Sequence, residues 1–292
     1  MTQTPTPAID APILVFGRTG QVATELRLQS DRVIALGRDE VDLSDPAACA
    51  RAIKEADAGA VINAAAYTAV DRAEEEEALA TLVNGAAPTA MAEACAAREL
   101  PLVHISTDYV FDGQGTSAWK PNDLTGPLGA YGRSKLAGEQ GIRNAGAHAS
   151  ILRTSWVFSA HGNNFVKTML RVSETRNALT VVADQVGGPT SAADIAAACL
   201  VMTDAMIVGQ AGGTFHFAGE PDVSWAEFAR EIFAQSGREV TVTDIPASDY
   251  PTPAKRPSNS RMDCTDLERE FGIARPNWRA SLAVVLNDLK GS

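Results

Sequence analysis

The chain has 292 residues, of which 45% are hydrophobic and 21% charged, and its formal net charge at pH 7 is −11. This length and composition are typical of an ordinary globular protein with a large core, built as one large domain or two intimate ones. The acidic balance argues against a nucleic-acid backbone or an anionic membrane as the principal partner. It is compatible with an anionic small ligand, because a local cluster of Arg and Lys can bind one inside an acidic protein.

Several features indicate a cytoplasmic location. No apolar run approaches the ~20 residues that a membrane span needs. Residues 1–11 have neither the basic region nor the apolar segment of a signal peptide, and we predict a flexible tail over residues 1–10. The cysteines are far apart, which favours small buried thiols in a reducing compartment over a disulfide framework or a zinc site. They are Cys49, Cys95, Cys199 and Cys264.

The first element is an apolar run over residues 12–16, which predicts a buried parallel strand. A glycine-containing turn and helical periodicity follow it, and this context is typical of a dinucleotide site, where backbone N–H groups approach a pyrophosphate. Ala23 stands where a third glycine is often found, and a plain strand–helix turn is the alternative. We predict cofactor contacts from the turn residues Gly17, Arg18, Thr19, Gly20, Gln21 and Val22.

The second predicted strand, residues 32–36, bears on which nicotinamide cofactor binds. A carboxylate about 20 residues past the first glycine often holds the ribose of NAD. Here Arg38 follows the strand and Arg18 lies in the turn, so we predict a site that accepts the 2′-phosphate of NADPH, with NADH as a second acceptable cofactor. In the alternative, both arginines are surface charges and Asp39 binds the ribose.

Helices and strands continue to alternate through the first half of the chain. We expect helices over residues 46–56 and 84–97, and strands over residues 60–63, 102–106 and 150–153. Asn84 is a helix cap or a deeper polar bridge, and His104 a packed core residue. Such alternation predicts a Rossmann-type, doubly wound parallel sheet, in which ligands bind at the carboxyl ends of the strands. Thr107 follows one of those ends.

Tyr131 and Lys135 are four residues apart at the start of a predicted helix, so they share one helical face. An ammonium beside a phenol favours the phenolate and would let the tyrosine exchange a proton near neutral pH. The same spacing occurs by chance on many helices, where it means a packed ring and a solvated amine.

The second half of the chain predicts helices over residues 164–173, 192–206 and 225–235, and strands over 179–182 and 214–217. Its loop over residues 250–261 is stiffened by proline and carries two arginines and a lysine, which suits a phosphorylated ligand or simply a basic surface. We assign residues 11–155 to a dinucleotide-binding domain, to which segments near 163–182 and 192–217 return. The remainder of residues 156–292 forms mainly a smaller substrate domain.

These motifs together resemble the extended short-chain dehydrogenase/reductase superfamily. The resemblance rests on the glycine turn, Thr107 after a strand, and the pair Tyr131 and Lys135. Further segments are similar to those of the dTDP-4-dehydrorhamnose reductase family, and the similarity covers nearly the whole chain after residue 11. These segments are residues 16–22, 63–71, 106–111, 153–157, 162–165, 184–190 and 251–261.

The resemblance implies a role for each matching residue. Tyr131 would be the proton donor, Lys135 its partner and a ribose ligand, Thr107 a hydrogen-bond donor to the substrate oxygen, and Asp108 at most an orienting group. Further cofactor contacts would come from Asp42, Leu43, Ser44, Ala64, Ala65 and Ala66. Candidate substrate contacts are Trp156, Asn163, Asn164, Gln185, Arg256 and Arg261.

One departure from the family concerns a metal. Some members hold magnesium at a dimer interface through glutamates, and Glu25 matches one such position. The segment after Thr190 reads Ser191-Ala192-Ala193-Asp194, with alanine where another glutamate would fall. This argues against a metal-bridged dimer, and we predict a monomer or homodimer without a metal.

The implied reaction is the NAD(P)H-dependent reduction of the C4 ketone of dTDP-4-dehydro-β-L-rhamnose to dTDP-β-L-rhamnose. Two other functions remain open from the residues alone. One is that of another extended short-chain enzyme acting on a nucleotide sugar, an epimerase or a dehydratase. The other is a non-catalytic regulatory subunit, similar to the β subunit of methionine adenosyltransferase.

Overall fold

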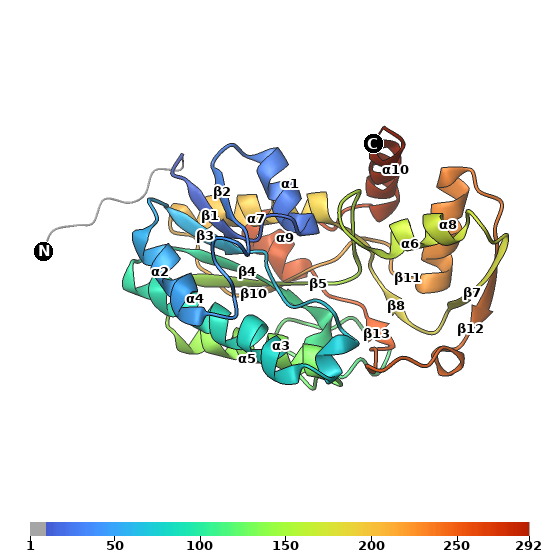
Figure 1. The fold of residues 1–292 in the computed structure, drawn as a ribbon, viewed down its shortest axis with the longest axis horizontal. Helices are drawn as coiled ribbons and strands as arrows, with labels where there is room; N and C mark the ends of the chain where they lie inside the picture. Colours follow the sequence, from blue (N-terminus) through green and yellow to red (C-terminus); the bar gives the residue numbers. More distant parts are fainter. Residues whose placement is uncertain (1–9, 292) are drawn as a thin grey trace, which may run out of the picture.

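The computed structural model describes residues 10–291, so the tail predicted over residues 1–10 lies outside the described range except for Asp10 (Figure 1). Its centre is a six-stranded parallel sheet in the order β10-β5-β4-β3-β1-β2. The strands are β1 (Ile13–Phe16), β2 (Val33–Leu36), β3 (Ala60–Asn63), β4 (Leu102–Thr107), β5 (Ala149–Thr154) and β10 (Thr214–Phe217). The doubly wound parallel sheet predicted from the sequence is confirmed.

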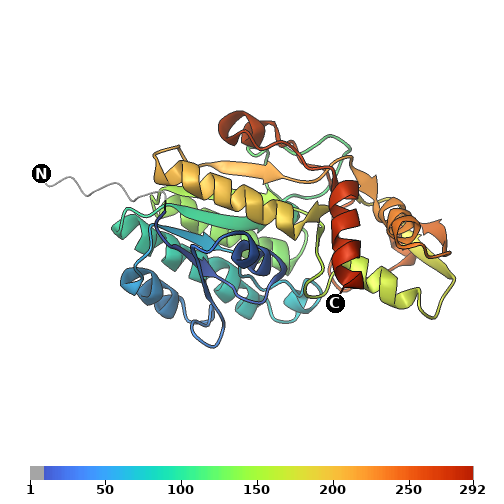
Figure 2. The same ribbon diagram turned by 90° about the horizontal axis from the view of Figure 1, so that it is seen from above.

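Helices cover both faces of this sheet (Figure 2). Strands covered on both faces are largely apolar, and β1 is entirely so. One face packs against α1 (Gln21–Gln29), α7 (Ala192–Ile207) and α9 (Thr265–Phe271). The other packs against α2 (Pro46–Glu55), α4 (Ala87–Ala97) and α5 (Ala130–Asn144). The strand order reverses between β1 and β3, which is where doubly wound folds bind ligands.

A second body lies at the other end of the molecule (Figure 1). Its aromatic core joins α6 (Phe165–Val172), α8 (Trp225–Ser236) and α10 (Trp278–Lys290). Beside them, β7 (Ala178–Val182) pairs in parallel with β12 (Thr241–Ile245). The expected return of residues 163–182 to the main sheet is therefore wrong, because Phe165 and Met169 of α6 pack into the aromatic core instead. Residues 192–217 supply α7 and β10 to the main sheet.

Short elements connect the two bodies. A three-stranded sheet joins β8 (Val186–Gly187), β11 (Val223–Ser224) and β13 (Asn259–Ser260), and β6 (Val157–Phe158) pairs with β9 (Thr190–Ser191). The remaining elements are α3 (Glu77–Thr81), a π-helix (Leu82–Ala86) and three 3₁₀ turns (Arg72–Glu74, Asp108–Val110 and Ala247–Asp249). Within residues 10–291, no helix has the length and apolar character needed to cross a bilayer.

Candidate active site

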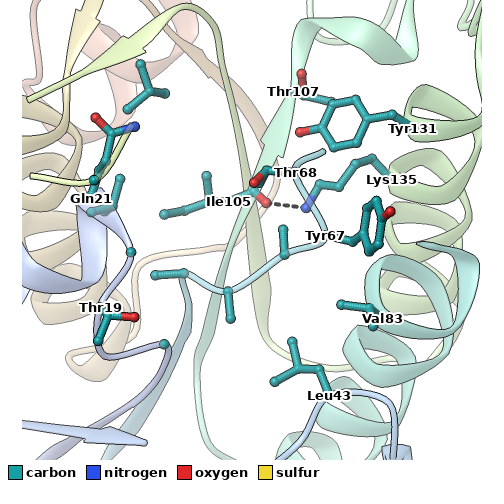
Figure 3. Close-up of a pocket in the computed structure, with 18 of the residues that line it drawn as sticks. Thr19, Gln21, Leu43, Tyr67, Thr68, Val83, Ile105, Thr107, Tyr131 and Lys135 are labelled. Atoms are coloured by element: carbon teal, nitrogen blue, oxygen red, sulfur yellow. Dashed lines mark hydrogen bonds between the residues drawn. The ribbon is translucent and has the colours of Figure 1, made fainter. Parts of the chain in front are cut away.

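A cavity of about 1360 Å³ opens at the carboxyl ends of β1, β3, β4 and β5 (Figure 3). Most of the residues selected from the sequence line it. They are Gly17, Arg18, Thr19, Gly20, Gln21, Val22, Arg38, Asp42, Leu43, Ala64, Ala65, Ala66, Thr107, Asp108, Tyr131, Lys135, Trp156 and Asn163. Ser44, Asn164, Gln185, Arg256 and Arg261 are not part of this lining.

The glycine turn brings backbone close to backbone at the start of α1. Gly17 has φ +113°, a conformation that a side chain rarely adopts, and a Cβ there would lie 3.3 Å from Ala23 Cβ and 3.4 Å from the Ala64 carbonyl carbon. Ala23 is therefore accommodated at the third glycine position because Gly17 has no side chain. Gly20 caps α1 without a side-chain hydrogen bond, so the first N–H groups of the helix face the cavity, as a pyrophosphate site requires.

The two arginines predicted to bind a 2′-phosphate lie at the rim beside β2. Arg18 forms ion pairs with Asp39 and Glu40 and donates to the Ala35 carbonyl oxygen at 3.2 Å. The Arg38 side chain is 82% exposed and its Nε lies 3.2 Å from Asp42 Oδ2. Both arginines line the cavity, and neighbouring carboxylates pair with their guanidinium groups. Their binding of a 2′-phosphate stays a prediction.

Tyr131, Lys135 and Thr107 meet on one wall of the cavity (Figure 3). Tyr131 lies in the first turn of α5 and packs edge-on against Tyr109, with ring centroids 5.4 Å apart. A Cβ on Gly132 would overlap the Tyr109 carbonyl oxygen, so this glycine lets the helix approach the strand end that carries Thr107. The Thr107 hydroxyl lies beside the Tyr131 phenol (Figure 3).

The expected lowering of the Tyr131 pKa by Lys135 is not found. Burial raises the pKa of Tyr131 to about 12, and the neighbouring Thr107 hydroxyl opposes this rise only in part. The reason is the direction of the lysine side chain, whose Nζ donates to the Ile105 carbonyl oxygen at 2.7 Å (Figure 3). Tyr131 therefore holds its proton at neutral pH, as a proton donor must.

Asp108 joins the catalytic wall to the second body. Its carboxylate is buried and accepts hydrogen bonds from Thr107 Oγ1 at 3.1 Å and from Ser260 Oγ of β13 at 2.5 Å. Burial raises the pKa of Asp108 to about 6, although both hydrogen bonds lower it. Asp108 thus orients Thr107 and ties the residue 250–261 loop to the site.

Two polar residues of the first half have larger roles than the sequence indicated. Asn84 bridges the backbone of Tyr67 in both directions and donates to Ser134 Oγ at 3.0 Å, so it connects the loop after β3 to α5. The expectation that it is a cap or a polar bridge is resolved in favour of the bridge. His104, expected to be a packed core residue, is buried but hydrogen-bonded at both ring nitrogens. A histidine in an otherwise apolar strand is the signal that pointed to it, since buried polar groups need partners.

The candidate substrate residues fall into two groups. Trp156 and Asn163 line the cavity, and Trp156 stacks on Trp225 with centroids 3.5 Å apart. Asn164 instead caps α6, accepting from Lys167 N at 3.1 Å and donating to Gln21 Oε1 at 3.0 Å. The Asn164 side chain is thus occupied by protein partners in this structure, and its contact with a substrate stays a prediction.

The remaining predicted contacts are engaged elsewhere. Arg256 is paired with Asp71 at 2.9 Å, Arg261 Nη1 donates to Asn259 Oδ1 at 3.1 Å, and Gln185 is buried outside the lining. Ser44 donates its backbone N–H to Asp42 Oδ1. None of these residues belongs to the lining of the cavity, so their contacts with cofactor or substrate stay predictions.

The candidate metal position was also located. Glu25 Oε1 lies 3.2 Å from His161 Nε2, and Asp194 accepts hydrogen bonds from Ser191 and Ser281. Within residues 10–291, no three His, Cys, Asp or Glu side chains gather as a metal site would require. These carboxylates therefore have protein partners of their own.

Comparisons with known proteins agree with this geometry. The RmlD substrate binding domain family matches residues 11–290. A dTDP-4-dehydrorhamnose reductase of Sinorhizobium fredii is 45% identical over 279 residues, covering 92% of this chain and 94% of that protein. A solved dTDP-4-dehydrorhamnose reductase of Clostridium acetobutylicum superposes with a TM-score of 0.90 at 37% identity, covering 96% and 99%. Another, from Bacillus anthracis in complex with NADP, has a TM-score of 0.88 at 31% identity, covering 95% and 99%.

Proposed function

The chain belongs to the dTDP-4-dehydrorhamnose reductase family, and we infer that it reduces the C4 ketone of dTDP-4-dehydro-β-L-rhamnose to dTDP-β-L-rhamnose at the expense of NADPH. The observation that carries this inference is the shared cavity, which has the glycine turn on one side and Thr107, Tyr131 and Lys135 on the other. A binding protein has no need of that proton donor, so the regulatory alternative is not favoured.

The residues present fit a nicotinamide cofactor. The free N–H groups at the start of α1 suit the pyrophosphate, and Arg18 and Arg38 suit the 2′-phosphate of NADPH. When bound, the cofactor supplies the hydride. We propose that Asp42, Leu43 and the alanines after β3 complete its site, since they line the same part of the cavity.

The protein's own contribution is orientation and a proton. Negative charge grows on the ketone oxygen as hydride reaches C4, and Tyr131 donates its proton to that oxygen. Thr107 directs a hydrogen bond at the same atom once its hydroxyl turns from Asp108. Asp108 accepts a hydrogen bond from Thr107. We therefore propose that Asp108 positions Thr107 and does not act as the acid.

We propose that the sugar nucleotide lies between the two bodies. Trp156 offers an apolar ring to the sugar, and its position is fixed by the Trp225 stack. The loop over residues 250–261 borders the site through Ser260 and through the ion pair between Arg256 and Asp71. Displacement of Asp71 by a diphosphate would free Arg256 for the ligand.

The test is consumption of reduced cofactor with dTDP-4-dehydrorhamnose generated in situ. We expect oxidation of NADPH, with a lower kcat/KM for NADH. Arg38→Ala should weaken the binding of NADPH alone and so bring the two values of kcat/KM closer together. No consumption of either cofactor would remove the proposed function. Protein that purifies with tightly bound NAD and oxidises no NADPH would instead favour an epimerase or a dehydratase. Cytoplasmic location and the monomeric or dimeric state stay predictions.

A further inference from the structure

A buried chain of hydrogen bonds runs from the cofactor loop to the catalytic lysine. The Ala65 N–H donates to Asn63 Oδ1 at 3.2 Å, and Asn63 Nδ2 lies 3.0 Å from His104 Nδ1. His104 Nε2 in turn lies 3.2 Å from Lys135 Nζ. Asn63, His104 and Lys135 are 1%, 0% and 2% exposed, so each of their polar atoms depends on these partners.

The direction of each hydrogen bond follows from the first donor. A backbone N–H can only donate, so the Asn63 atom facing Ala65 is the carbonyl oxygen, and its NH₂ group faces His104. His104 Nδ1 must then accept. A neutral imidazole with an accepting Nδ1 carries its hydrogen on Nε2, and that N–H is aimed at Lys135.

An N–H group pointing at an amine suits only one charge state of the amine. A neutral amine has a lone pair that accepts from Nε2–H and still has hydrogens for the Ile105 carbonyl oxygen at 2.7 Å. An ammonium ion has no lone pair, so it would face the imidazole hydrogen with a positive charge. A positively charged imidazole would be worse, since Asn63 Nδ2 would then face a second donor.

We propose that His104 is a positioning residue for Lys135, holding its Nε2–H toward the lysine nitrogen and so favouring the neutral amine over the ammonium ion. This inference rests on the proposed role of Lys135 beside Tyr131. After Tyr131 has given its proton to the ketone oxygen, a proton must return to the phenolate. The ammonium form of Lys135 can supply that proton to the phenolate, and the neutral amine left behind is stabilised by accepting from His104.

Other groups around Lys135 act in both directions. Burial lowers the pKa of Lys135 to about 8, while the carboxylate of Glu139, one turn further along α5, raises it. Tyr131 on α5, Tyr67 on the loop after β3 and Asp108 after β4 share the cavity wall with the lysine. Glu139 is itself paired with Arg153 at 2.7 Å, which limits its effect on Lys135. His104 acts in the same direction as burial.

The tautomer can be observed directly in the protein without added cofactor. The chain has four histidines, and the variants His148→Gln, His161→Gln and His216→Gln assign three of them, leaving His104 by elimination. We expect the ¹⁵N shifts of His104 to show hydrogen on Nε2 and none on Nδ1 between about pH 6.5 and 9. Hydrogen on Nδ1, or on both nitrogens, would overturn the proposal whatever the activity of the protein.

A second measurement uses His104→Gln and the pH profile of kcat/KM. Glutamine can turn its carbonyl oxygen to the lysine, and this favours the ammonium ion. If activity at alkaline pH is lost as Lys135 gives up its proton, the midpoint of that loss should rise by about 1 pH unit, the scale of one hydrogen bond. His148→Gln is the matched control, since His148 bonds the Gln210 carbonyl oxygen away from the cavity. An alkaline limb that stays in place, or moves down, would contradict the proposal.

Discussion

Tyr131 illustrates how a side chain becomes a proton donor through its surroundings. Burial raises the pKa of its phenol to about 12, so the proton stays in place until charge develops on a neighbouring oxygen. From the sequence, the spacing of Tyr131 and Lys135 predicted the pair but not its electrostatics. The direction of the lysine amine depends on the Ile105 carbonyl, a contact that no spacing rule contains.

Tyr131→Phe tests this role with the least change in shape. We expect kcat to fall by roughly 10² or more, the scale of a lost general acid, with the affinity for NADPH nearly unchanged. Steady-state kinetics and cofactor titration measure the two quantities. Near-normal turnover in this variant would remove Tyr131 from the proton transfer.

Asp108 gives a pH dependence of stability. Its pKa is raised to about 6, above its usual value near 3.9, so between those pH values the folded protein holds a proton that the unfolded chain releases. The free energy of unfolding should therefore contain a contribution that falls as the pH rises through this window.

Asp108→Asn should remove that contribution. Its unfolding free energy relative to the natural protein should rise by up to ~3 kcal/mol between pH 4 and 7, measured by urea titration. Asp31→Asn, at an exposed position, serves as the control and should show a constant difference. A constant difference for Asp108→Asn as well would show that its carboxyl titrates normally in the fold.

At the scale of elements, α5 is held unusually close to the π-helix Leu82–Ala86. A Cβ at Gly138 would overlap the carbonyl oxygen of Asn84 in the π-helix. A Cβ at Gly141 would overlap Thr89 in α4, which follows directly. This close approach lets Asn84 reach Ser134, whose hydroxyl donates to the Tyr131 carbonyl oxygen at 2.7 Å. The packing of the two helices thus fixes the position of the catalytic turn.

Gly138→Ala tests this packing, because its expected effect on the free energy of unfolding is opposite to the usual effect of this substitution in a helix. In an exposed helix the change stabilises by about 1 kcal/mol, but here we expect destabilisation of roughly 1–3 kcal/mol from overpacking, together with lower kcat. Gln140→Ala, two residues along on the exposed side of α5, should stay within about 0.5 kcal/mol in urea unfolding. Stabilisation by Gly138→Ala would show that the two helices have room to move apart.

The strands of the main sheet could be predicted from apolar runs, because a strand covered on both faces is largely apolar. The packing position of residues 163–182 could not be predicted in this way. Phe165 and Met169 mark an apolar helical face, but nothing local says whether it covers the sheet or α8. The short strand β12 and the helices α9 and α10 were missed for a similar reason, since they depend on partners distant in sequence.

At the scale of the whole molecule, the candidate site draws its residues from segments far apart in the sequence. The first half supplies the glycine turn and the proton donor, and sequence motifs predicted these because they are local. The second half contributes Trp156 and Asn163 to the lining, while Arg256 and Arg261 bond to neighbouring residues. Their engagement depends on the packing of loops, which local spacing does not specify. The boundary near residue 155 remains a proposal.

The reduction itself is tested most directly by following the hydride. With NADPH deuterated at the transferred position of its nicotinamide and dTDP-4-dehydrorhamnose as substrate, the account predicts dTDP-L-rhamnose with one deuterium, at C4, as read by mass spectrometry and NMR. Tyr131→Phe should form this product at least ~10²-fold more slowly. Product without deuterium at C4, or no dTDP-L-rhamnose from the natural protein, would contradict the account.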